Sequence, residues 1–134
     1  MNGNSNRSTG RFGENVVCCY LKKQGIGILE RNYYTKHGEI DIIAEDDSHI
    51  IFIEVKTRFE NELMAKYGRP AAAVNRVKRQ HILYAANSYL RENKYRTHKT
   101  IRLDVAEVYL SVIGDNEPQF YSARINYIKS AFSR

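Results

Sequence analysis

Residues 39–57 read EIDIIAEDDSHIIFIEVKT, and this stretch decides the fold of the chain. Two runs rich in β-branched residues, Glu39–Ala44 and Ile50–Thr57, flank the polar segment EDDSH, which predicts a β-hairpin. Neither run alternates cleanly between polar and apolar residues. Strands of this kind are buried on both faces of a sheet, so we expect helices on each side of the hairpin.

The segments on either side of this hairpin predict helices and further strands. Apolar residues that recur every three or four positions indicate helices, and β-branched runs indicate strands. The predicted helices are Gly10–Gln24, Pro70–Glu92 and Ile125–Ser133, and the further strands are Ile26–Asn32, Thr100–Tyr109 and Gln119–Ala123. The order of elements is therefore α-β-β-β-α-β-(β)-α, an α/β fold.

The length of 134 residues fits a single domain over residues 10–134, preceded by a flexible tail at residues 1–9. No apolar run approaches the roughly 20 residues that a membrane span needs, and residues 1–10 lack the apolar region of a signal peptide. The cysteines are the two neighbours Cys18 and Cys19, which favours a reduced, intracellular chain. We therefore expect a cytoplasmic protein.

The chain is basic. Its 21 Lys and Arg residues outnumber its 15 Asp and Glu residues, so the formal net charge is +6. Such an excess favours a polyanionic partner, either nucleic acid or an anionic surface. The basic residues are scattered, with no run of five, so charge alone does not decide between these partners.

Charged residues inside the two central strands are the most informative feature of the sequence. A symmetric turn in the hairpin pairs residues whose numbers sum to 95, which places Asp41 opposite Glu54 and Glu39 opposite Lys56. All four side chains then point to one face, because side chains alternate along a strand. Two facing carboxylates repel each other, and a divalent cation between them would reverse that cost.

Lys56 and Glu14 extend this constellation. Lys56 follows Glu54 by two residues, where it could position or deprotonate a water molecule or stabilise developing negative charge. Glu14 lies on the apolar stripe of the first predicted helix and should point toward the sheet. Structural roles stay open for the same residues. Glu39 and Lys56 could form a cross-strand ion pair, Asp41 could pair with an arginine, and Glu14 could stabilise the helix N-terminus.

Taken together, these residues resemble the YraN-like family of small bacterial proteins over residues 10–132. The resemblance is carried by Gly13-Glu14, Gly38–Ala44 (GEIDIIA), Phe52–Arg58 (FIEVKTR), Gly68-Arg69-Pro70, Lys78 and Arg102–Val105 (RLDV). That family is similar to the PD-(D/E)XK nuclease superfamily, with Holliday-junction resolvases among its nearer analogues. The signature would be Asp41, twelve intervening residues and then Glu54-Val55-Lys56, with Ile40 in place of the signature proline.

This resemblance implies a restriction-endonuclease-like core, in which helices flank a mixed β-sheet. It implies that Glu14, Asp41 and Glu54 bind Mg²⁺ or Mn²⁺ as the cofactor and that Lys56 assists the attacking water. These four residues would then be the catalytic ones. The expected activity is that of a metal-dependent endonuclease that hydrolyses DNA phosphodiester bonds, with branched or damaged DNA as the substrate class.

Polar residues after the central hairpin are candidates for contacts with nucleic acid, and the resemblance adds two accessory positions in the second helix. The set is Arg58, Lys66, Arg69, Arg76, Lys78, Arg79, Gln80 and Tyr84. They would hold phosphates if the nuclease fold is correct, and they would form a solvated face otherwise. DNA is favoured over RNA, no membrane is expected, and a homodimer stays open.

Two other functional classes stay open as well. The chain could be a nucleic-acid-binding module that keeps the nuclease fold without catalysis, or its basic surface could meet an acidic protein. Among the remaining residues, Tyr33, Tyr34 and Tyr67 are favoured for stacking on bases. Asp104, inside a predicted strand, is expected to form a structural ion pair with a nearby arginine.

Overall fold

The structure is a computed structural model that describes residues 3–60, 76–93, 98–114 and 120–131. These residues form two helices and a five-stranded sheet, which confirms the α/β class with the order α-β-β-β-α-β-β. The elements are α1 (Gly3–Lys23), β1 (Gly27–Thr35), β2 (Gly38–Glu45), β3 (His49–Phe59), α3 (Arg76–Glu92), β4 (Thr100–Ile113) and β5 (Phe120–Ile128).

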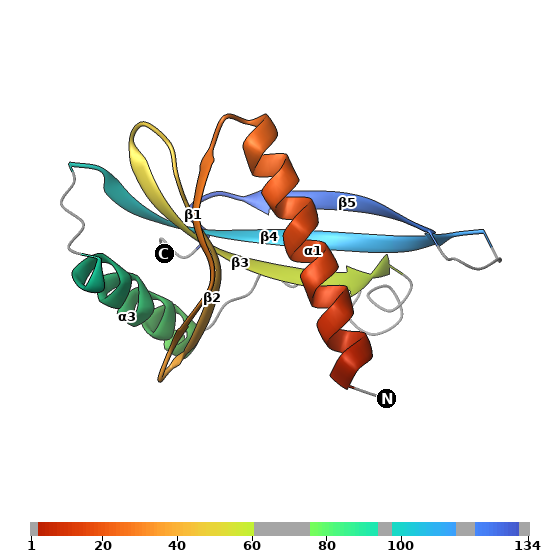
Figure 1. Cartoon of the computed structure of the whole chain (residues 1–134), viewed down its shortest axis with the longest axis horizontal. Coiled ribbons are helices and arrows are strands. Elements are labelled where there is room, and N and C mark those ends of the chain that lie inside the picture. The colour runs from red at the N-terminus through yellow and green to blue at the C-terminus, as the bar shows by residue number, and fades with distance from the viewer. Residues whose placement is uncertain (1–2, 61–75, 94–97, 115–119, 132–134) are drawn as a thin grey trace.

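The five strands form one mixed sheet in the order β1-β2-β3-β4-β5. Neighbouring strands are antiparallel except for β3 and β4, which are parallel. A parallel pair needs a long crossover connection, and α3 lies in this one. Figure 1 shows the β1–β2 hairpin crossing the direction of β3, β4 and β5, so the sheet is strongly twisted.

The central hairpin has the predicted register. Residues of β2 and β3 whose numbers sum to 95 are paired from Glu45 with Ile50 to Ile42 with Ile53. Beyond Ile53, β3 continues along β4 as far as Phe59, while β2 continues along β1 as far as Gly38. The two strands therefore part just after Ile42 and Ile53, and we call this point the fork.

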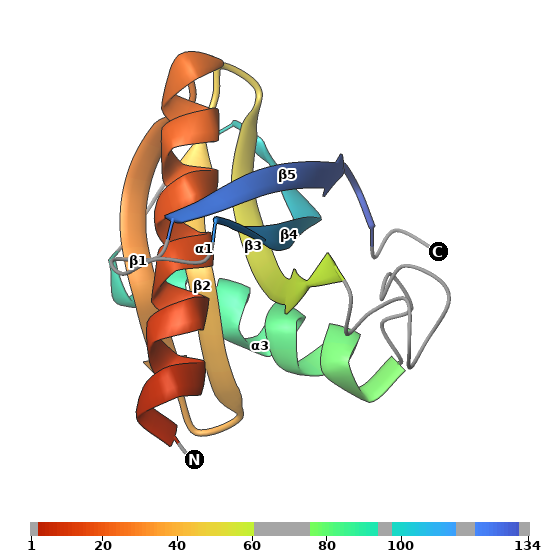
Figure 2. The same cartoon turned by 90° about the vertical axis from the view of Figure 1, so that its right-hand side faces the viewer.

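The sheet is covered on both faces, as the apolar central strands predict. Val17 and Leu21 of α1 pack with Ile53 on one face. Ile82 of α3 packs with Phe52 on the other face. Because Phe52 and Ile53 are neighbours, one strand supplies both cores, which is why β3 lacks polar alternation. Figure 2 shows the two helices running in different directions against the strands.

The prediction of a C-terminal helix over Ile125–Ser133 is wrong, because residues 120–128 form β5 and pair with β4. The sequence YSARINY at residues 121–127 alternates between apolar and polar side chains, which is the strand period. Ile125 and Tyr127 pack on the α1 side of the sheet, so this alternation has a structural consequence. The last strand is thus longer than predicted, and residues 132–134 lie outside the description.

The other elements differ from prediction mainly at their ends. Helix α1 begins at Gly3 rather than Gly10, and β1 and β4 extend to Thr35 and Ile113. The predicted end of α3 at Glu92 is confirmed, whereas its predicted start at Pro70 lies outside the described residues. Neither of the two described helices is long and apolar enough to cross a membrane.

Candidate metal centre

Asp41 of β2 lies at the fork, where backbone pairing between β2 and β3 has ended. Its Oδ2 accepts a hydrogen bond of 2.8 Å from the Val55 N–H of β3, so the side chain bridges the two strands. Burial raises the pKa of Asp41 to about 7 against the opposing effect of this hydrogen bond, and the nearby carboxylates of Glu54, Glu14 and Glu39 raise it further. Burial and the neighbouring carboxylates at the fork therefore favour the protonated form of Asp41.

Glu14 and Glu39 converge on Asp41. One carboxylate oxygen from each of the three residues lies within 4.8 Å of the others, and we call these residues the acidic group. Asn32 of β1 joins two of them, because its Nδ2 donates to Glu14 Oε1 at 3.2 Å and to Glu39 Oε2 at 3.1 Å. Arg31 Nη2 lies 3.5 Å from Glu14 Oε1 and offsets part of the charge.

The backbone of Asn32 explains how one side chain reaches both carboxylates. Asn32 has a φ of 54°, in the left-handed region that asparagine tolerates better than most residues. Its neighbours Arg31 and Tyr33 pair with Ile42 and Ile40, the residues on either side of Asp41. The amide therefore lies beside the acidic group, at the β1 position that faces Asp41.

Gly13 allows α1 to pack closely on β3, which places Glu14 at the fork. A Cβ at Gly13 would overlap Thr57 Oγ1 and would lie 3.0 Å from Thr57 Cβ. The helix backbone therefore approaches β3 more closely than any residue with a side chain allows. Because Glu14 follows Gly13 directly, this close packing brings the Glu14 carboxylate near the sheet. The Glu14 side chain is only 14% exposed.

Glu54 is held by lysines rather than by the acidic group. Its Oε2 lies 3.3 Å from Lys56 Nζ and 3.2 Å from Lys78 Nζ, and its side chain is 13% exposed. The sequence predicts Lys56 beside Glu54, and the distance agrees with that. The ion pair between Glu39 and Lys56, left open as a structural alternative, is not among the described contacts, and Glu39 instead accepts a hydrogen bond from Asn32. Lys78 brings α3 into the site.

The acidic group suits a hard divalent cation. Mg²⁺ binds oxygens at about 2.1 Å, so two oxygens on opposite sides of one ion lie about 4.2 Å apart. The three oxygens lie within 4.8 Å of one another, close to this span. The three oxygens border an open pocket of about 290 Å³, which leaves room for water or a phosphate. This pocket is lined by Gly10, Arg11, Glu14, Asn32, Tyr34, Glu39 and Asp41.

The basic candidates are distributed unevenly around this site. Three of them, Arg76, Lys78 and Arg79, lie on α3 together with the polar candidates Gln80 and Tyr84, and only Lys78 has a described contact with the acidic group or Glu54. Arg58 lies on β3, beyond Lys56. Lys66 and Arg69 lie outside the described residues, as does Tyr67.

The sequence places Glu39 on the same face as Asp41 but does not predict it as a metal ligand, and it does not predict Asn32 at the site. The pairing of Glu39 with Lys56 extends the hairpin register past the fork, where that register no longer holds. Asn32 sits in an expected strand end, and its left-handed backbone has no clear sequence signal beyond the asparagine itself. Among the tyrosines favoured for stacking, Tyr33 is buried, and its hydroxyl donates to Glu92 at 2.6 Å.

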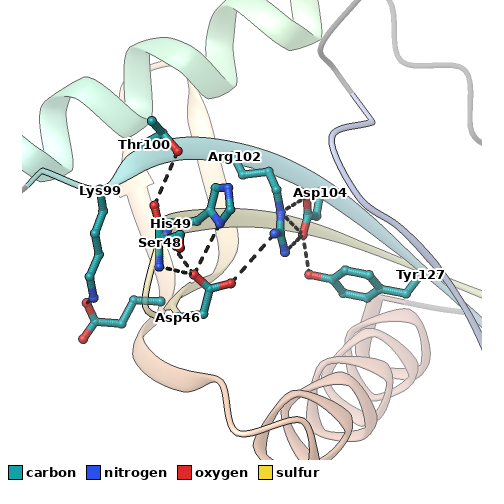
Figure 3. Close-up of polar contacts among 9 residues, drawn as sticks. Asp46, Ser48, His49, Lys99, Thr100, Arg102, Asp104 and Tyr127 are labelled. Atoms are coloured by element: carbon teal, nitrogen blue, oxygen red, sulfur yellow. Dashed lines mark hydrogen bonds and ion pairs between the residues drawn. The ribbon is translucent and has the colours of Figure 1, made fainter.

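A second polar cluster extends from the β2–β3 turn to Asp104 of β4 (Figure 3). The Arg102 guanidinium contacts Asp104 at 3.0 Å, and the Tyr127 hydroxyl donates to the same carboxylate at 2.7 Å. Asp46 caps the β2–β3 turn by accepting from the Ser48 and His49 N–H groups. These carboxylates have satisfied partners, so the cluster is structural, and the expected ion pair of Asp104 is confirmed.

Comparison with known proteins places the chain among bacterial relatives. The model of the uncharacterised protein family UPF0102 matches residues 13–108. A UPF0102 protein of Clostridium botulinum (strain 657 / Type Ba4) is 41% identical over 127 residues, covering 95% of each chain. A UPF0102 protein of Clostridioides difficile (strain 630) is 41% identical over 128 residues, covering 96% of this chain and 99% of the relative. The match spans α1 to β4 and therefore includes every residue of the acidic group.

Proposed function

The chain belongs to the uncharacterised protein family UPF0102, and we propose that it is a nuclease that uses Mg²⁺ or Mn²⁺ to hydrolyse DNA phosphodiester bonds. The observation that carries this proposal is the convergence of Glu14, Glu39 and Asp41 at the fork. Three carboxylates so close together are costly unless a cation neutralises them. Burial, and to a smaller extent the neighbouring carboxylates, raises the pKa of Asp41 to about 7, so ionising Asp41 at this position is costly.

The residues around the fork would have different roles in phosphodiester hydrolysis. A divalent cation bound here would polarise the phosphate and lower the pKa of a bound water. Glu14, Glu39 and Asp41 supply the oxygens that would hold it. Lys56 lies on the adjacent strand, where its ammonium group can orient the water or stabilise the negative charge that develops on the phosphate. The ammonium group of Lys56 is held by Glu54, whose Oε2 lies 3.3 Å from Lys56 Nζ.

DNA is the proposed substrate because the chain is basic overall and the exposed Lys78 of α3 lies at the edge of the site. The chain carries a net charge of +6 even though the acidic group is included in that sum. Arg76 and Lys78 are exposed at the start of the described part of α3, and Lys78 contacts Glu54 beside the fork. Phosphate contacts of this kind position a nucleic acid without reading its sequence. The resemblance to PD-(D/E)XK nucleases favours the same chemistry and suggests branched or damaged DNA as the substrate class.

Cleavage assays test this proposal. Purified protein is incubated with branched, nicked and single-stranded DNA in the presence of Mn²⁺ or Mg²⁺, and products are separated on denaturing gels. We expect cleavage by the parent and a loss of at least about a hundredfold in Asp41→Asn and Lys56→Ala. Glu30→Gln is the matched control, because Glu30 is an exposed carboxylate of β1 outside the acidic group. Equal rates in the parent and in both site variants would refute the proposed site.

One observation favours a second candidate, a nucleic-acid-binding module without catalysis. Glu54, which the nuclease signature makes a metal ligand, is instead paired with Lys56 and Lys78. Calorimetric titration with Mn²⁺ separates the two candidates. Binding that is lost in Asp41→Asn supports the nuclease, whereas DNA binding without metal binding at millimolar Mn²⁺ supports the module.

A further inference from the structure

A group of aromatic rings lies beside the acidic group, where the turn between β1 and β2 meets α3. The rings of His37 and His81 stack with their centroids 5.2 Å apart and their planes inclined by 13°. The Tyr84 ring meets His37 edge-on at 4.5 Å. Lys36 Nζ lies 5.8 Å from the centroid of the Tyr84 ring. We call His37, His81 and Tyr84 the ring cluster.

The ring cluster and the acidic group share a border. His37 and His81 line a small hollow between the β1–β2 turn and α3, together with Glu39 and Lys78. Glu39 belongs to the acidic group, and Lys78 holds Glu54. A nucleotide whose phosphate lies at the acidic group would therefore have its base or its neighbour's base within reach of these rings.

Packing into the core does not explain the ring cluster. Tyr33 and Tyr89 also form an edge-on pair near α3, and these two side chains are only 8% and 5% exposed. Tyr84, in contrast, is 38% exposed, and His37 is exposed on the turn. The exposed rings of Tyr84 and His37 lie beside Lys36 and Lys78, and together they form a surface that suits a flat, anionic ligand.

From this arrangement we infer that the ring cluster stacks on an unpaired base of the DNA, so that the enzyme acts on DNA with an unpaired nucleotide next to the scissile phosphate. Such DNA includes flaps, gaps and single strands. A continuous duplex keeps its bases inside the stack and cannot offer one to a protein ring without paying for unstacking. This inference rests on the proposed nuclease function, and it adds the feature by which the substrate is chosen.

Binding without cleavage tests the inference. Fluorescence anisotropy in EDTA measures the affinity for a short single strand, a flap and a duplex of the same sequence. A 2-aminopurine at the unpaired position reports stacking through quenching of its emission. We expect Tyr84→Leu to weaken binding to the single strand and the flap about tenfold and to abolish the quenching. Duplex affinity should change by less than about twofold, since the stacking contribution is absent there.

Two further variants keep the test decisive. Tyr121→Leu is the matched control, because Tyr121 is also 38% exposed but lies on β5, where its ring contacts Phe12 and Phe59. Tyr84→Phe keeps the ring and should bind and quench like the parent. If Tyr84→Leu unfolds, as judged by circular dichroism, His37→Ala is read in its place, with the same loss expected.

The inference is overturned if Tyr84→Leu, or His37→Ala in its place, binds the single strand as tightly as the parent does. It is also overturned if the variant weakens single-strand and duplex binding equally, or if the parent itself does not bind single strands at low salt. Because no metal is needed, these outcomes are separate from a failure of cleavage. If the parent quenches the 2-aminopurine emission but cleaves none of the DNA substrates, the proposed nuclease activity is refuted, while stacking by the ring cluster is still supported.

Discussion

Asp41 determines how the site responds to pH. Its pKa is raised from 3.8 to about 7, so the folded state binds this proton more tightly than the unfolded state does. Stability is therefore lost as the pH rises from about 4 to about 7, and the full shift corresponds to at most ~4 kcal/mol. Asparagine keeps the oxygen that accepts from Val55 N–H but cannot ionise.

We therefore predict that Asp41→Asn stabilises the chain at about pH 8, by roughly 2 kcal/mol, and changes its stability little at about pH 4. Urea unfolding at both pH values in the presence of a chelator measures this difference. Asp47→Asn is the control, since Asp47 is an exposed carboxyl in the β2–β3 turn. An equal effect of Asp41→Asn at both pH values would contradict the assignment of the buried proton.

Lys78 determines how freely Glu54 can join the acidic group. Its Nζ lies 3.2 Å from Glu54 Oε2, on the same oxygen that Lys56 contacts. Removing the positive charge of Lys78 leaves more of the negative charge of Glu54 uncompensated, so the site attracts a cation more strongly. We predict that Lys78→Ala binds Mn²⁺ about threefold more tightly or better, as measured by calorimetry. Lys23→Ala, at the exposed end of α1, should leave the affinity unchanged; unchanged or weaker binding in Lys78→Ala would argue against this role.

At the scale of elements, the close packing of α1 on β3 depends on Gly13. Gly13→Ala should force α1 away from Thr57, because a Cβ would overlap Thr57 Oγ1. We expect a loss of about 1–3 kcal/mol in urea unfolding together with weaker Mn²⁺ binding, since Glu14 moves with the helix.

The same helix supplies the control for this prediction. A Cβ at Gly10 would meet nothing within 4 Å, and alanine is favoured over glycine in a helix, so Gly10→Ala should be neutral or stabilising by up to about 1 kcal/mol. Replacing Thr57 by alanine in the Gly13→Ala background should recover part of the lost stability. If both glycine variants behave alike, helix propensity rather than close packing explains the effect.

The elements also show where sequence patterns succeed and where they fail. The hairpin register could be predicted because a symmetric turn and two apolar runs fix it from Ile42 to Glu45. The same rule fails at Glu39, because β2 leaves β3 at the fork, and no local pattern marks where two strands part. At the C-terminus, residues 121–127 alternate with the strand period, and pairing with β4 extends this strand through Ile128, where a helix was expected.

At the scale of the whole molecule, the candidate site joins parts that are distant in the sequence. Glu14 comes from α1, Asp41 and Glu39 from β2, and Lys78 from α3 on the other face of the sheet. The sequence could nominate Glu14 and Asp41, because carboxylates on apolar faces are unusual there. It could not show that Glu39 rather than Glu54 stands with them, since that depends on the twist of the sheet and on Lys78.

Because the acidic group draws on α1 and β2, cation binding should stabilise the whole fold and not a single loop. A ligand at about a hundred times its Kd adds ~2.7 kcal/mol to the free energy of unfolding. For a domain of 134 residues, that corresponds to a rise in Tm of about 10 °C. We predict such a rise with Mn²⁺ for the parent and for Glu30→Gln, measured by calorimetry at about pH 8, where Asp41 is ionised. Asp41→Asn should show little change, and an equal rise in that variant would place the bound ion away from the fork.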